Sequence, residues 1–163
     1  MRLLIASLTS LILSTLAQLP PSSPEQSAAS QPRVAARPVP ASQASPRFTA
    51  IDITIDSGNQ PFAAYQFELL ASGADAKIVG VEGGEHAAFR EPPYYDPAAL
   101  SQNRIIIAAF NTGRDLPSGK TRVARLHLQI TGGEPTYKVK LDVAGDSDGK
   151  PVTAKIDFTE MKR

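Results

Sequence analysis

The sequence predicts an all-β fold of the β-sandwich type, and three observations lead to this prediction. Short segments alternate apolar and polar residues, as in Ile51 to Asp56, where three isoleucines face one way. The segment Arg104 to Phe110 is apolar on both sides, which is typical of a strand covered on both faces. Turn residues separate the segments at short spacing, and no amphipathic helical period occurs.

Length and composition predict three regions in the chain of 163 residues. Residues 1–17 have the composition of a signal peptide, residues 18–46 that of a disordered linker, and residues 47–163 that of the folded β-sandwich domain. We therefore expect one folded domain, preceded by a signal peptide and a linker.

The first region predicts export. Arg2 is a short positive start, an apolar core follows, and Thr15 and Ala17 supply small residues for cleavage before Gln18. An uncleaved anchor helix is the alternative, but it needs about 20 apolar residues, and this segment is shorter and rich in Ser and Thr. We expect a secreted, periplasmic or cell-envelope protein that is not inserted in a membrane after cleavage.

Residues 18–46 contain seven prolines among Ser, Ala and Gln, with few large apolar residues. Such a segment cannot bury enough surface to offset its conformational entropy, so we expect disorder with polyproline character. It is either a spacer for the domain or a tail that export leaves behind.

Seven strands follow from period-two alternation and from the apolar segment. In the alternating strands the apolar residues should face inward, with Val152 and Phe158 among them, and His127 should lie on a solvent-exposed side. The expected strands are Phe48 to Asp56, Ala63 to Leu70, Ala76 to Val81, Arg104 to Phe110, Val123 to Ile130, Tyr137 to Val143 and Val152 to Phe158.

The segment Glu85 to Asn103 is irregular. Pro92 and Pro93 prevent regular ladder pairing there, and residues 97–100 are compatible with a single helical turn. Tyr94 and Tyr95 follow the prolines and are suited to present flat, amphipathic surface to a partner or a sugar. The alternative is that one ring caps the edge of the core, because adjacent residues point apart.

Composition argues against several functions. The chain has no Cys, which excludes disulfides, zinc–thiolate sites and a thiol nucleophile. Lys and Arg number 17 against 16 Asp and Glu, so charge gives no reason to expect nucleic-acid binding. No Ser-His-Asp arrangement is recognisable, and we predict no catalytic residues, no cofactor and no metal site.

Two segments resemble metal or acid–base sites weakly. His86 lies near several glutamates in sequence, but a single loop histidine is more often inert. The segment Asp146 to Gly149 resembles part of a calcium loop, yet it lacks the further ligands of the full pattern. We interpret it as a hairpin turn, where Asp-Gly is favoured.

The order of the segments resembles that of bacterial cohesin-like domains between about Thr49 and Ile130. The similarity rests on Phe62 to Leu69 after the first strand, a strand ending in two glycines, and the Ile-rich strand. It continues with a Leu-Pro-Ser-Gly loop at 116–119 and the segment Val123 to Ile130. The resemblance implies a jelly-roll sandwich of about nine strands, without catalytic activity.

The resemblance also implies a function. Cohesins bind dockerin modules through one sheet face, so we expect a binding module that recognises a protein partner, dockerin-like or other, through a sheet face and loops. A carbohydrate-binding module that recognises a polysaccharide through Tyr94 and Tyr95 is the alternative, and an enzyme is the third. The candidate binding residues are outward-facing strand residues and the two tyrosines: Gln66, Glu68, Tyr94, Tyr95, Arg125, His127 and Gln129.

Overall fold

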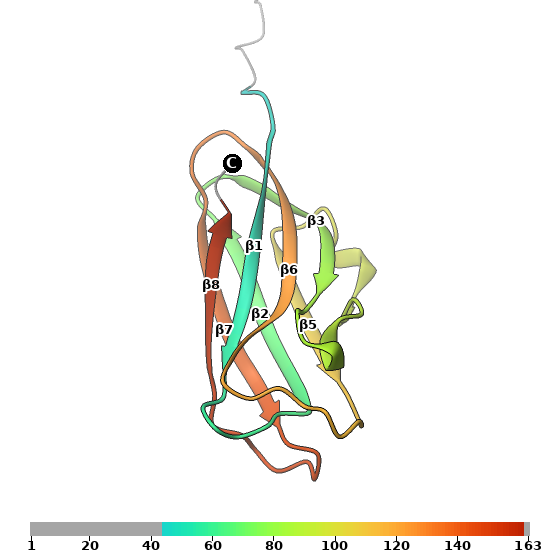
Figure 1. Cartoon of the computed structure of the whole chain (residues 1–163). Helices are drawn as coiled ribbons and strands as arrows, with labels where there is room; N and C mark the ends of the chain where they lie inside the picture. The colour runs from blue at the N-terminus through green and yellow to red at the C-terminus, as the bar shows by residue number, and fades with distance from the viewer. Residues whose placement is uncertain (1–43, 162–163) are drawn as a thin grey trace, which may run out of the picture. The chain divides into compact units, whose positions relative to one another are not determined.

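The computed structural model describes residues 44–161, so the predicted signal peptide and nearly all of the predicted linker lie outside the described residues. The described part is a β-sandwich of eight strands with two short 3₁₀ helices (Figure 1). The strands are β1 (Arg47–Asp56), β2 (Ala64–Ser72), β3 (Asp75–Gly83), β4 (Tyr94–Tyr95), β5 (Arg104–Phe110), β6 (Lys120–Thr131), β7 (Thr136–Gly145) and β8 (Lys155–Met161), and the 3₁₀ helices are η1 (Ala87–Phe89) and η2 (Pro97–Ala99).

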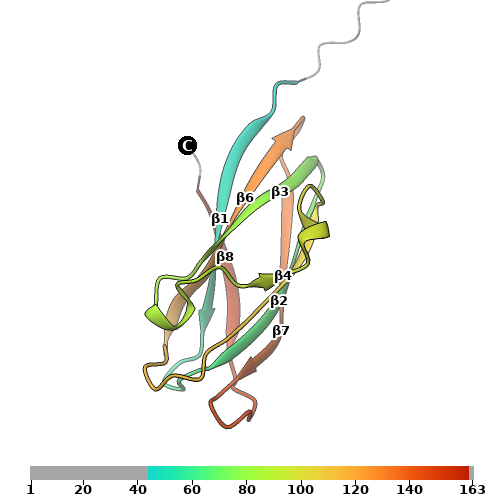
Figure 2. The same ribbon diagram turned by 90° about the vertical axis from the view of Figure 1, so that its right-hand side faces the viewer.

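Each sheet has four strands, and every pairing is antiparallel. One sheet has the order β3-β6-β1-β8, and the other has the order β4-β5-β2-β7. Figure 2 views the side where the segment between β3 and β5 lies, with both 3₁₀ helices and the short strand β4. This segment is the irregular part that the sequence predicts, and β4 follows immediately after its two prolines.

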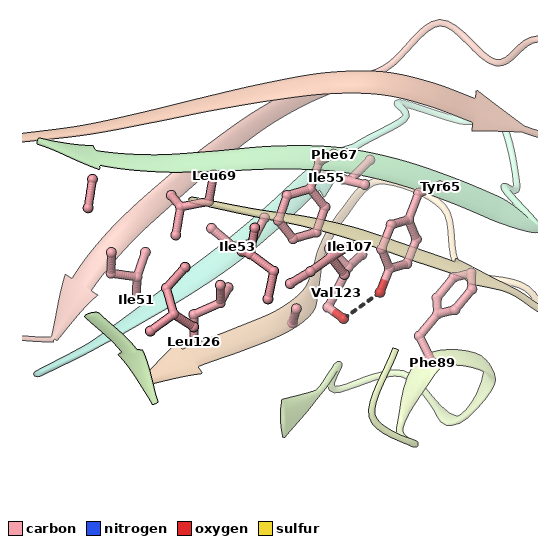
Figure 3. Close-up of a cluster of buried hydrophobic side chains, with 14 of the residues drawn as sticks. Ile51, Ile53, Ile55, Tyr65, Phe67, Leu69, Phe89, Ile107, Val123 and Leu126 are labelled. Atoms are coloured by element: carbon pink, nitrogen blue, oxygen red, sulfur yellow. Dashed lines mark hydrogen bonds between the residues drawn. The ribbon is translucent and has the colours of Figure 1, made fainter. Parts of the chain in front are cut away.

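The core lies between the two sheets and consists of the inward side chains of alternating strands (Figure 3). Ile51, Ile53 and Ile55 on β1 are fully buried, as their period-two spacing predicts. Phe67 and Leu69 on β2 meet them from the other sheet. The alternating strands therefore supply one apolar face each to a common core.

A β-bulge interrupts the alternation of β6. The register with β1 shifts between Ile53 and Thr54, which face Ala124 and Arg122, and Val123 between the latter two is the extra residue. Val123 and Ala124 are both buried, so the clean alternation expected for this strand is wrong at its start. The Tyr65 hydroxyl donates a hydrogen bond of 2.9 Å to the Val123 carbonyl (Figure 3).

The end of the irregular segment closes the edge of β3. Ile78 donates its N–H to the Gln102 carbonyl and accepts the Ser101 N–H. Ser101 has a φ of 69°, a left-handed conformation that is uncommon outside glycine. Asn103 then bonds the Ala71 backbone through its side chain and its carbonyl, which fixes the start of β5.

Three strand predictions need correction. β5 has only one face on the core, because Ile105 and Ile107 are buried whereas Phe110 on the outer side is 64 % exposed, so the expected burial of both faces is wrong. The last strand begins at Lys155, three residues after Val152, which is buried beside the isolated bridge of Pro151 to Gly145.

Val143 is the third correction, since it is 49 % exposed where an inward position was expected. The register of β7 with β2 shifts between Leu141 and Val143, so the inward alternation of β7 does not extend to Val143. Within the part of the chain that the structure describes, none of the helices has the length and apolar character needed to span a membrane.

Candidate binding surfaces

The strand residues proposed as contacts lie on opposite sides of the sandwich. Gln66 and Glu68 point outward from β2, in the sheet β4-β5-β2-β7. Arg125, His127 and Gln129 point outward from β6, in the other sheet. A single flat partner cannot contact both sets, so the predicted residues form two separate surfaces.

The outer surface of β6 carries polar side chains that contact side chains of the neighbouring strands. Arg125 donates two hydrogen bonds to Asp52 on β1, at 2.6 and 2.9 Å. These bonds hold the pKa of the Asp52 carboxyl below its usual value. His127 Nε2 lies 2.7 Å from Glu82 Oε1 on β3. These contacts link β6 to β1 and to β3.

The outer surface of the other sheet carries exposed apolar side chains, and we call it the apolar face. Strand registers place Tyr94 opposite Ala108, Ala108 opposite Gln66, and Gln66 opposite Val143. Phe110 lies opposite Ala64 in the adjacent row. The apolar face consists of Ala64, Tyr94, Ile106, Ala108, Phe110 and Val143.

The two adjacent tyrosines have different environments. Tyr94 is 68 % exposed, and its ring stacks on Phe110 with 5.9 Å between centroids and 11° between planes. Tyr95 points the other way and packs against the core. The pair therefore contributes one surface ring and one ring that caps the core, and the partner of the surface ring is Phe110.

Sequence reasoning missed Phe110 and Ile106 as surface residues because the whole segment was interpreted as buried. The alternation of side chains along a strand could have identified them: if Ile105 and Ile107 point inward, Ile106 and Phe110 must point outward. Val143 was not recoverable in this way, because the bulge that re-aims it leaves no mark in the local alternation.

Ion pairs border the apolar face. Arg104 donates hydrogen bonds of 2.7 and 3.1 Å to Glu68, and this lowers the pKa of the Glu68 carboxyl. Lys140 donates a 2.6 Å hydrogen bond to Asp142, which lowers the pKa of that carboxyl too. Gln66 is polar and lies between Ala108 of β5 and Val143 of β7, which are apolar.

The weakly metal-like segments serve local structure. His86 Nδ1 accepts the Ala88 N–H and so caps η1. Asp146 Oδ1 accepts the N–H groups of Asp148 and Lys150, which closes the predicted turn. Over residues 44–161, no three His, Cys, Asp or Glu side chains are grouped so that they could hold a metal ion.

Comparison with known proteins gave no match to this sequence among protein-family models, curated proteins or solved structures.

Proposed function

We propose that this chain is an exported, cohesin-like binding module that recognises a protein partner through its apolar face. The observation that supports this proposal is where exposed large apolar side chains gather. Among the described residues, Tyr94, Ile106, Phe110 and Val143 are exposed on one sheet. Apolar surface gathered in this way is typical of interaction sites.

The layout of the surface supports a protein partner. Apolar residues form the centre, and the pairs Glu68–Arg104 and Lys140–Asp142 lie beside them. Protein interfaces have this anatomy, with an apolar centre and a polar rim. The exposed rings of Tyr94 and Phe110 are rigid and large, which suits them as anchors.

The opposite sheet is the weaker candidate. It has three exposed large apolar residues, Phe48, Val79 and Met161, whereas the apolar face has four, two of which are stacked rings. In the next outward row of this sheet, Arg125 is already paired with Asp52. Arg125, His127 and Gln129 are therefore outside the binding surface that we propose.

Strand pairing supports a jelly-roll arrangement. β1 pairs with β8, β2 with β7, β3 with β6, and β4 with β5. These are the pairs of a long hairpin whose two arms are rolled together into two sheets, which is the principle of the jelly roll. This arrangement agrees with the resemblance to cohesin-like domains, whose partners are dockerin modules.

Affinity capture from the source cells tests the proposal with matched variants. The bait is the wild-type chain, Phe110→Ser, Val143→Ser or Phe48→Ser, the last being a comparably exposed apolar residue on the other sheet. A partner qualifies if the first two substitutions weaken its binding about tenfold or more while Phe48→Ser retains it. If every captured protein is retained by Phe110→Ser and Val143→Ser, the apolar face is not the binding surface.

A further inference from the structure

A pocket of about 430 Å³ opens beside β4, at the edge of the apolar face. Ligand pockets span about 300–1,000 Å³, so the volume is sufficient for a small ligand. Its lining includes Tyr94 and Asp96 on one side, and Arg104, Ile106 and Ala108 of β5 on the other. Strand pairing brings the two sides together, because Tyr94 lies opposite Ala108.

One wall of the pocket is an aromatic ring. Phe110 stacks against Tyr94, and the pocket borders Tyr94 but not Phe110. The ring of Tyr94 therefore offers its other face to the pocket. Ile106 and Ala108 add apolar surface below it, so this part of the pocket is suited to a flat, apolar ligand face.

Polar groups line the remaining rim. Arg104 uses two of its N–H groups on Glu68, and its side chain is 53 % exposed, so further donors face solvent. Asp96 accepts the Ala98 N–H with Oδ1 and has a second oxygen that is free to accept. Because Glu68 neutralises Arg104 while Asp96 adds a negative charge, the rim disfavours an anion and suits a neutral ligand that both donates and accepts hydrogen bonds.

We infer that this pocket binds a neutral pyranose sugar within a glycan or polysaccharide. The C–H face of the ring stacks on Tyr94, while its hydroxyl groups accept from Arg104 and donate to Asp96. Among small ligands, a neutral sugar combines an apolar face with an edge of hydroxyl donors and acceptors. This activity goes beyond protein recognition and also depends on Asp96, which lines the pocket and is not part of the apolar face.

Titration of the ¹⁵N-labelled full-length chain with cellohexaose, xylohexaose, mannohexaose and chitohexaose tests the site by NMR. At least one of these neutral sugars should shift the amide signals of Tyr94, Ile106 and Ala108. Tyr94→Ala should weaken that binding about tenfold or more, because the stacking surface is lost. Arg104→Met should weaken that binding as well, because the N–H groups that donate to the sugar hydroxyls are lost.

Three controls make the outcome specific. Phe48→Ala removes an exposed ring of similar accessibility on the other sheet and should leave sugar binding unchanged. Val143→Ser impairs the proposed protein-binding face but not the pocket, and should also leave it unchanged. Hexagalacturonate, which is anionic, should not bind. If no neutral hexasaccharide shifts these signals, or if binding survives Tyr94→Ala, the sugar site is refuted while the protein-binding proposal stands.

Discussion

Arg125 and Asp52 link β6 to β1 through two hydrogen bonds on the outer surface of their sheet. The hydrogen bonds from Arg125 lower the pKa of Asp52 from its usual 3.8 in the folded chain. A lowered carboxyl pKa means that the folded state is stabilised above the unfolded pKa. That contribution is lost as pH falls through the folded pKa.

Asp52→Asn should therefore lower the free energy of unfolding by about 1 kcal/mol at neutral pH. The difference in unfolding free energy between wild type and variant should become smaller below about pH 4, as the wild-type carboxyl becomes protonated. Urea denaturation at neutral pH and at about pH 2 measures this difference at each pH. Asp75→Asn is the control, because Asp75 has only an exposed contact of 3.6 Å with Lys77. If the difference in unfolding free energy does not change with pH, the ionised Asp52 carboxyl is not the source of the stabilisation.

Ile107 and Phe110 lie on the same strand with opposite environments, since Ile107 is fully buried and Phe110 is 64 % exposed. Ile107→Ala should cost about 2–5 kcal/mol through lost burial and a cavity. Phe110→Ala should cost under about 1 kcal/mol, because it removes an exposed ring. Chemical denaturation of both variants checks the assignment. If Phe110→Ala lowers the free energy of unfolding as much as Ile107→Ala does, the outer face of β5 is covered after all.

At the scale of elements, glycines fix how β3 gives way to the irregular segment that carries β4. Gly83 ends β3, and Gly84 donates its N–H to the Phe89 carbonyl at 2.6 Å. A Cβ on Gly83 would collide with the Arg90 carbonyl and lie 2.6 Å from the Glu91 oxygen. The absence of a side chain thus lets the returning segment pack against the strand end.

Gly83→Ala should lower the free energy of unfolding by about 1–3 kcal/mol, because the backbone of residues 90–91 has to move. Thermal or urea denaturation measures this loss. Gly133→Ala is the matched control, since a Cβ there comes no closer than 3.5 Å to its nearest neighbour, the Gly73 carbonyl. Equal losses for the two variants would show that chain entropy, and not the close approach, dominates.

At the scale of the whole molecule, β1 begins and β8 ends at the same end of the sandwich, as the pairing of Ala50 with Met161 requires (Figure 1). Seven residues of β1, Ala50 to Asp56, are thereby held between two neighbouring strands, which ties the start of the domain to its end. Within the described residues, both sheets are built from strands that begin at Arg47 or later.

Limited proteolysis should cut within residues 18–46 and leave a core that starts near Arg47. Deleting residues 18–43 should leave the thermal midpoint nearly unchanged, and a fall of several degrees would contradict the predicted linker.

Intact mass of the exported protein should correspond to a chain that starts at Gln18. Recovery in the membrane fraction with Met1 retained would instead indicate an anchor.

The all-β class and most of the core could be predicted from the amino-acid sequence, because side-chain direction in a strand alternates with period two. Ile51, Ile53 and Ile55 are buried as that period requires. The turn at Asp146 and the helical turn at Pro97 were also predictable, since their chemistry is local.

Which outward residues share a surface became clear from the arrangement of the strands in the two sheets. Strand order separates Gln66 from His127, and it brings Tyr94 beside Phe110, although fifteen residues of the chain lie between these two rings. The bulges that turn Val123 inward and expose Val143 arise from mismatched pairing between strands far apart in sequence. Such pairings depend on which strands become neighbours, and local alternation carries no record of that choice.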